Sequence, residues 1–279
     1  MIPSIFKKIY NYSAEFIQQV DSIAQIAAER ALADIRMDQK YRDRRRLAHY
    51  EHTVFSQAGE DGILRELMRR AGGPSRTFVE FGVGNGSQNN TKFLLKTGWT
   101  GLWIESGAAQ VRVISRAFSD AIAAGQLTVL HKSVEPATIV GLFQRAKIPS
   151  EFDILSIDID GHDYHVWAAI EGYRPRVVVV EYNSIFFPDV EWVAPYRAGW
   201  RWDRSRDFGA SLKALERLGE RKGYKLTGCN LAGVNAFFVR EDLISDAFCG
   251  PFTAENHYEP PRYYLTMRRT GHRPASPGL

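Results

Sequence analysis

The sequence predicts an α/β fold, in which a mostly parallel sheet carries helices on both faces and an N-terminal helical extension precedes it. Two patterns indicate this fold. From about Thr53 onward, short apolar runs alternate with longer amphipathic stretches, as in β–α–β units. The last two apolar runs are separated only by a tight turn, which is typical of an antiparallel hairpin at the edge of such a sheet.

Residues 1–50 differ from the rest of the chain and are expected to form the helical extension. Between Ala14 and about Arg46 there is no Gly or Pro, and apolar side chains recur at steps of three and four. Such a helix cannot bury its stripe alone, so it either packs on its own domain or pairs with a second copy in a homo-oligomer. The basic cluster at 40–46 is expected to be a solvated face. The stripe consists of Phe16, Val20, Ile23, Ala27 and Ala31.

The following segments supply the sheet and its helices. The expected strands are residues 77–81, 100–105, 127–131, 152–158 and 176–182, followed by a hairpin of residues 223–230 and 234–240. The expected helices between them are residues 60–70, 88–97, 107–124, 135–147 and 163–172. Residues 51–250 then form the main domain. Residues 251–279, rich in Pro, Arg and Tyr, are expected to be a poorly ordered C-terminal tail.

Composition narrows the class of protein. The 279 residues are 44% hydrophobic and 24% charged, which is ordinary for a soluble globular protein. The net charge of +4 is mild, so we do not expect a nucleic-acid partner. Cys229 and Cys249 are too few for a disulfide scaffold and lack zinc-site spacing. An apolar run of about 18 residues and a signal-peptide pattern are both absent from the sequence, which favours a cytoplasmic enzyme without a transmembrane segment.

The segment FVEFGVGNGSQNN, residues 78–90, indicates a nucleotide-binding turn after the first strand. Its glycines are Gly82, Gly84 and Gly86, whereas a dinucleotide fingerprint needs glycine where Ser87 stands. A phosphate-binding P-loop is excluded because no Gly-Lys-Ser/Thr follows. Glu80 would repel a pyrophosphate but suits a cationic, amine-bearing ligand. These features predict S-adenosylmethionine as the cofactor, although Glu80 could instead cap the next turn.

Two further strand ends extend this prediction. Glu105 ends the second strand, where a carboxylate can accept hydrogen bonds from both ribose hydroxyls. The alternative is that Glu105 is a surface acid. The third strand leads to Ser133, at the position where such folds commonly contact adenine.

Acidic residues gather where the fourth strand ends. Asp158, Asp160, His162 and Asp163 fall within six residues, at the edge of the sheet where open α/β folds bind ligands. Asp158, Asp160 and His162 are the predicted catalytic residues, with His162 or Asp160 as the base. Asp163 could instead cap the following helix. The Asn-Pro-Pro-aromatic motif of amine methylation is absent from the sequence here, which favours an oxygen nucleophile.

The fifth strand ends beside this cluster, at Glu181 and Asn183. Alternation puts these two on one side of their strand, and we expect them to neighbour Asp158. Oxygen ligands of this kind can hold Mg²⁺ or another divalent metal, which would lower the pKa of a substrate hydroxyl. The predicted metal ligands are Asp158, Glu181 and Asn183. A metal-free site, in which these acids bind the substrate, stays open.

Six motifs together resemble the FkbM-type group of class I methyltransferases, over roughly residues 53–242. The resemblance implies a seven-stranded, Rossmann-like methyltransferase sheet and S-adenosylmethionine-dependent O-methylation, often of sugars or natural products. It also implies that Gln57 and Asp61 line the cofactor pocket. The Asp-x-Asp at 158–160 is similar to the metal-and-base arrangement of macrocin-type sugar O-methyltransferases. The motifs are SQAGEDGIL (56–64), FVEFGVGNGSQNNT (78–91), GLWIE (101–105), LSIDIDGHDY (155–164), VVVEYNS (178–184) and NAFFVR (235–240).

The long insertion at residues 184–209 is the predicted acceptor lid. Loops of this length in a compact domain are usually functional, and its aromatic content argues against disorder. Aromatic rings beside arginines suit a sugar bearing a phosphate or carboxylate, and they would also suit a nucleobase. The alternatives are a hydrophobic subcluster or a dimer contact, and for the whole chain an RNA methyltransferase or a catalytically silent, cofactor-binding assembly subunit. The predicted substrate-binding residues are Trp192, Tyr196, Arg197, Trp200 and Arg201.

Overall fold

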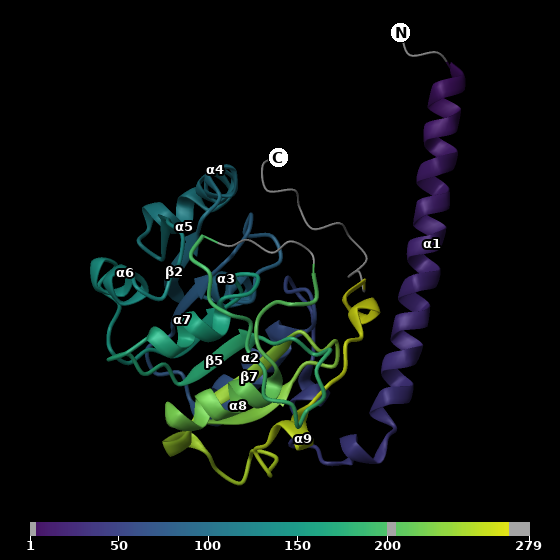
Figure 1. Cartoon of the computed structure of the whole chain (residues 1–279). Coiled ribbons are helices and arrows are strands. Elements are labelled where there is room, and N and C mark those ends of the chain that lie inside the picture. The colour runs from purple at the N-terminus through teal and green to yellow at the C-terminus, as the bar shows by residue number, and fades with distance from the viewer. Residues whose placement is uncertain (1–3, 200–204, 268–279) are drawn as a thin grey trace.

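A computed structural model describes residues 4–199 and 205–267 of the chain (Figure 1). Its centre is a seven-stranded sheet with the order β3-β2-β1-β4-β5-β7-β6. Strands β1 to β5 are parallel, and β7 runs antiparallel to both of its neighbours. The predicted fold class is therefore confirmed. The strands are β1 (Thr77–Phe81), β2 (Thr100–Glu105), β3 (Leu127–His131), β4 (Ile154–Ile157), β5 (Val177–Glu181), β6 (Tyr224–Cys229) and β7 (Asn235–Arg240).

Helices cover both faces of the sheet. Four consecutive valines of β5, Val177–Val180, have no exposed surface, because alternate members enter cores on opposite faces. Helices α6, α7 and α8 close one core, and α2, α3 and α4 close the other. The bounds are α2 (Glu60–Ala71), α3 (Lys92–Lys96), α4 (Ala108–Ala117), α5 (Ser119–Ala123), α6 (Ile139–Arg145), α7 (Asp163–Ala169), α8 (Leu212–Arg221) and α9 (Ala254–His257).

The single helix predicted over 107–124 is divided into α4 and α5 at Phe118. The ring of Phe118 turns into the core and packs edge-on against Trp103, with ring centroids 4.9 Å apart. Residues 163–172 also form a shorter helix than predicted, because α7 ends at Ala169. The strands match their predicted ranges more closely, since the apolar runs that define most of them are buried on both sides; β3, at the edge of the sheet, is partly exposed.

The N-terminal extension contains one long helix, α1 (Ser4–Arg36), which lies beside the domain in Figure 1. It ends ten residues before Arg46, the predicted limit, because the Asp38 side chain accepts a hydrogen bond from the Lys40 amide and starts a 3₁₀ turn. The remainder of the extension consists of the 3₁₀ helices η1 (Gln39–Arg42) and η2 (Leu47–Tyr50).

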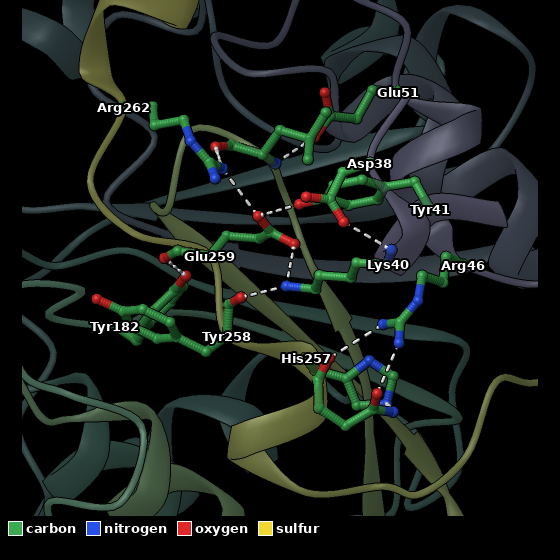
Figure 2. Close-up of polar contacts among 12 residues, drawn as sticks. Asp38, Lys40, Tyr41, Arg46, Glu51, Tyr182, His257, Tyr258, Glu259 and Arg262 are labelled. Carbon is green, nitrogen blue, oxygen red and sulfur yellow. Dashed lines mark hydrogen bonds and ion pairs between the residues drawn. The ribbon is translucent and has the colours of Figure 1, made fainter. Parts of the chain in front are cut away.

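The C-terminal segment, expected to be poorly ordered, is packed into the fold as far as the structure describes it. It contains α9 and the 3₁₀ helix η4 (Tyr263–Met267), while η3 (Glu241–Leu243) follows β7. The reason lies in the contacts of Glu259, which is 3% exposed and accepts hydrogen bonds from Lys40, Tyr41 and Arg262 at 2.6 to 2.8 Å (Figure 2). A buried ionic network therefore joins the two ends of the described chain, and composition alone does not reveal it.

Candidate active site

A cavity of about 160 Å³ opens at the carboxyl ends of β1 and β4. Gly82 makes the turn after β1 possible: its φ is +70°, and an added Cβ would lie 1.6 Å from the Asp158 carbonyl oxygen. Gly84 also has a positive φ, but no described atom lies within 4 Å of where its Cβ would be. The backbone at Gly84 can therefore approach a ligand closely. We call this the loop cavity; its lining includes Gln57, Glu60, Glu80, residues 82–85, residues 87–90, Asp158, Val234 and Asn235.

Glu80 lies in the wall of the loop cavity, and its carboxylate is already well bonded. It accepts hydrogen bonds from the backbone amides of Asn90 and Thr91 and from the side chains of Asn89, Thr91 and Ser156. Burial raises the pKa of Glu80, and these hydrogen bonds oppose the shift. Glu80 therefore caps the turn at residues 89–91, as the alternative prediction has it. Because Glu80 also lines the loop cavity, its carboxylate could in addition attract a cationic ligand.

Glu105 is buried rather than a surface acid. Its Oε2 accepts a hydrogen bond from the Gly84 amide at 2.9 Å, and its Oε1 accepts one from the Gly107 amide at 2.7 Å. The carboxylate at the end of β2 is therefore held against the glycine turn. Ser133, by contrast, is exposed beyond β3 and is not among the residues that line the loop cavity.

The loop cavity is also lined by hydrogen-bond acceptors from distant parts of the sequence, which the sequence did not predict. Glu60 Oε1 accepts hydrogen bonds from Asn230 and Asn235, although 170 or more residues separate them. The side-chain oxygens of Asn89 and Asn235 are buried and find no hydrogen-bond partner among the described residues. Such unpaired acceptors favour a ligand that donates hydrogen bonds, such as an ammonium group.

Asp61, expected beside Gln57, faces away from the loop cavity. Its Oδ2 accepts hydrogen bonds from the amides of Val54, Phe55 and Ser56, so it shapes the turn that precedes Gln57. Asp61 lines a separate hollow next to α2. Only Gln57 of this pair borders the loop cavity.

The carboxylates of Asp158, Asp160 and Glu181 form a cluster beside the loop cavity. One oxygen of each lies within 4.8 Å of the others. Asp160 reaches the cluster through a left-handed backbone, with φ +58°. Burial, followed by repulsion from neighbouring carboxylates such as Asp163, raises the pKa values of Asp158 and Glu181 well above their usual range. Burial followed by repulsion from Glu105 raises the pKa of Asp160.

Asn183 and Asp163 have structural contacts instead of joining this cluster. The Asn183 amide donates hydrogen bonds to the carbonyls of Arg206 and Phe208, which ties the insertion to the end of β5. Asp163 accepts hydrogen bonds from the Ile159 and Gly161 amides. Burial raises its pKa to about 6, against the effect of those amides. The arrangement therefore favours Asp160, rather than Asn183, as the third oxygen donor beside Asp158 and Glu181.

A second cavity, of about 390 Å³, lies under the insertion, and we call it the insertion cavity. His162 lines it and is only 7% exposed. The ring of Tyr196 lies 4.9 Å from that of His162, and its hydroxyl donates a hydrogen bond to Glu135 at 2.5 Å. Burial, followed by the charge of His165, lowers the pKa of His162.

The predicted substrate residues are partly brought together here. Trp192 and Arg197 line the insertion cavity, and Trp192 stacks on Phe186 with ring centroids 4.5 Å apart. Trp200 and Arg201 lie outside the described residues. The remaining lining residues are Gly161, Ala194, Pro195, Ser205 and Asp207.

The comparisons with known proteins give the following. No protein-family model matches the chain, and no curated protein matches it. Among solved structures, the chain is similar to a glycopeptide N-methyltransferase, MtfA, complexed with S-adenosylmethionine (14% identity, TM-score 0.41, 67% of this chain and 96% of that one). It is also similar to the methyltransferase domain of bacterial CtHen1 (13%, 0.42, 66% and 97%) and to a Bacillus cereus O-methyltransferase in complex with SAH (14%, 0.36, 57% and 66%).

These similarities are likenesses of fold only. The fold of this chain is established by the strand order of its own sheet. None of the helices in the described part of the chain combines the length and apolarity needed to cross a membrane. Both cysteines are buried and carry free thiols.

Proposed function

We propose that the chain is an S-adenosylmethionine-dependent O-methyltransferase of the FkbM type, acting on a hydroxyl of a sugar, glycan or glycosylated small molecule. One observation carries the proposal. The segment 158–162 contributes Asp158 to the loop cavity and Gly161 and His162 to the insertion cavity. A donor in the first cavity and an acceptor in the second would therefore meet at these acidic and imidazole side chains.

The residues of the loop cavity fit the cofactor. The unpaired oxygens of Asn89 and Asn235, together with Glu60, provide acceptors for an α-ammonium group. The open space at Gly84 allows the backbone to approach a ligand, and Glu105 beside it can accept from ribose hydroxyls. Glu80 adds negative charge to the same wall.

Methylation of a hydroxyl requires the removal of the hydroxyl proton. S-adenosylmethionine supplies a methyl group on a cationic sulfur; transfer to a hydroxyl breaks that carbon–sulfur bond, forms a carbon–oxygen bond and releases the hydroxyl proton. The lowered pKa of His162 keeps its imidazole neutral at pH 7, so it can accept this proton. Asp160 is the alternative base, and its raised pKa brings it closer to the working pH.

The carboxylate cluster also fits a divalent cation. Glu181 Oε2 is buried and has no hydrogen-bond partner among residues 4–199 and 205–267, and Asp158 and Asp160 offer oxygens nearby. Hard oxygen donors of this kind are those that Mg²⁺ and Mn²⁺ prefer. A bound cation would offset the repulsion that raises the pKa values of Asp158 and Glu181, and it would acidify a coordinated hydroxyl.

The insertion cavity supports a polar, ring-shaped acceptor. Trp192 offers an aromatic surface for a sugar face, and Arg197 offers a cation for an attached phosphate or carboxylate. These side chains line the same cavity as His162.

The test is direct. Binding of S-adenosylhomocysteine should be measured by calorimetry, and methyl transfer from labelled cofactor should be screened over nucleotide sugars, glycans and glycosylated metabolites, with RNA as a comparison. We expect cofactor binding and labelling of a carbohydrate acceptor that EDTA diminishes. Absence of cofactor binding would reject the proposal, and labelling of RNA alone would replace the acceptor class.

A further inference from the structure

Helix α1 presents two apolar faces, and within residues 4–199 and 205–267 only one of them contacts the domain. Ala28 and Leu32, near its C-terminal end, are 2% and 7% exposed and pack in one cluster with Leu231 and Leu265. These contacts hold the last two turns of α1 against the domain. At about 1.5 Å per residue, α1 is roughly 50 Å long, and in Figure 1 it extends beyond this contact along the side of the domain.

The second face is exposed and apolar. Phe16, Val20, Ile23 and Ile26 are exposed by 66%, 47%, 68% and 66%. Large aliphatic and aromatic side chains are rarely left this exposed in a contiguous stripe unless another surface covers them. The stripe is offset around the helix from Ala28 and Leu32, so the described part of the domain in the same chain does not cover it.

Three residues of the stripe follow a heptad pattern together with Ala27, which indicates what covers them. Phe16, Val20, Ile23 and Ala27 are spaced by four, three and four residues, and toward the N-terminus the same spacing passes through the polar Ser13 to Ile9 and Phe6. This is the seam of a helix that pairs with another helix. The four exposed side chains supply on the order of 400 Å² per copy, about half of the ~800 Å² per partner of a stable interface.

We infer that the exposed face of α1 pairs antiparallel with α1 of a second copy of this chain. With Val20 opposite Ile23 of the second copy, the large Phe16 faces the small Ala27, so the seam is filled by complementary volumes. A parallel pair would put Phe16 against Phe16 and Arg30 against Arg30, which combines overpacking with like-charge repulsion. The antiparallel pair also aligns the helix dipoles favourably.

The first experiment measures mass against concentration by analytical ultracentrifugation of the full chain. We expect a dimer whose dissociation constant rises at least 100-fold in Ile23→Glu. Glu29→Lys, an exposed charge change on the other side of the helix, is the matched control and should leave the dimer intact. Because Ile23 is exposed in a single copy, thermal unfolding at low concentration should be unchanged in both variants, which separates loss of pairing from loss of folding.

A second experiment fixes the orientation. Phe16→Cys and Ala27→Cys chains are treated with a short bismaleimide, separately and as a mixture; the native Cys229 and Cys249 are buried. An antiparallel pair crosslinks only in the mixture, since Phe16 then lies about 16 Å along the axis from its own counterpart. Crosslinking of each variant alone would overturn the antiparallel assignment.

Two outcomes overturn the inference as a whole. One is a chain that is monomeric at every concentration, or a dimer that Ile23→Glu does not weaken. The other is a monomer that floats with phosphatidylcholine–phosphatidylglycerol vesicles and loses this binding in Ile23→Glu, which would assign the face to a lipid surface. Neither result depends on cofactor binding or methyl transfer, so the proposed function is tested separately.

Discussion

Asp158 follows β4 and Glu181 ends the neighbouring β5, and one carboxylate oxygen of each lies within 4.8 Å of the other and of Asp160. Burial, followed by repulsion from nearby carboxylates, raises the pKa values of both acids. Repulsion between carboxylates is therefore concentrated at the edge of the sheet where parallel α/β folds bind their ligands. Substitution of either acid tests whether these carboxylates serve catalysis.

Asp158→Asn should remove methyl transfer while the protein stays folded. The substitution preserves shape but removes a charge beside the proposed reaction centre, so we expect turnover to fall at least about 100-fold. Affinity for S-adenosylhomocysteine should change little, and the melting temperature should rise because repulsion with Glu181 is relieved. Asp120→Asn, on α5, is the control. Unchanged turnover in Asp158→Asn would remove this residue from the mechanism.

The contribution of Asp163 to stability should fall as pH rises from about 4 to above 6. Burial raises the pKa of Asp163 to about 6, so at this site the folded protein binds more protons than the unfolded chain across this window. The contribution is of the order of 1–3 kcal/mol, and the raised pKa values of Asp158 and Glu181 act in the same direction, whereas the pKa of His257, which burial lowers to about 3, acts in the opposite direction. Denaturant titrations of the wild type and of Asp163→Asn at pH 5, 6.5 and 8 isolate this contribution; a stability difference between the two chains that does not change with pH contradicts it.

Divalent cations should restore part of the stability that is lost when the buried carboxylates ionise at high pH. At pH 8, Mn²⁺ or Mg²⁺ at 100 times its dissociation constant should add about 2.7 kcal/mol to the free energy of unfolding. The melting temperature should rise and return to its starting value on addition of EDTA. In Glu181→Gln, the rise should be reduced. A melting temperature that does not respond to either cation would support the metal-free reading of the cluster.

Glu105→Gln should weaken cofactor binding more than it weakens the fold. The carboxylate can accept hydrogen bonds from two ribose hydroxyls, and hydrogen bonds to charged groups contribute about 1.5–3 kcal/mol. We expect the dissociation constant for S-adenosylhomocysteine to rise roughly 10- to 100-fold, measured by calorimetry. Ser133→Ala should have a much smaller effect, because Ser133 is a neutral, exposed side chain beyond β3, whereas Glu105 is a buried carboxylate bonded to the Gly84 turn.

Tyr196→Phe should affect the acceptor rather than the cofactor. The change removes the hydrogen bond to Glu135 that holds this part of the insertion over His162. We expect the KM for the acceptor to rise about 5- to 10-fold, in line with a lost charged hydrogen bond, with unchanged cofactor affinity. Tyr263→Phe, an exposed residue of η4, is the matched control. Equal effects in both variants would argue against a lid.

Glu259→Gln should destabilise the whole chain. The substitution leaves Lys40 and Arg262 without their buried counter-charge, which costs about 2–4 kcal/mol. Glu255→Gln removes a carboxylate of similar length from an exposed ion pair with Lys213 and should cost less than about 1 kcal/mol. Thermal unfolding of both variants compares the two. A similar, small loss in each would mean that the network in Figure 2 contributes little.

The sequence by itself determined the order and kind of the main elements. The valines of β5 had to be buried on both sides, and the glycines at 82–86 had to form a turn, because these are local consequences of apolar runs and of left-handed backbone. Local chemistry also located the acids at the ends of β4 and β5.

Only the tertiary structure decided which side chains meet. Alternation along β5 predicted that Glu181 and Asn183 point to the same side, but β5 ends at Glu181 and the alternation ends with it. Asn183 instead contacts the insertion, and Asp160, with its left-handed backbone, lies beside Glu181 in the carboxylate cluster. Glu60 joins Asn235 across 175 residues, and Glu259 joins Lys40 across 219. These pairs depend on long-range packing, which leaves no periodic signal in the chain.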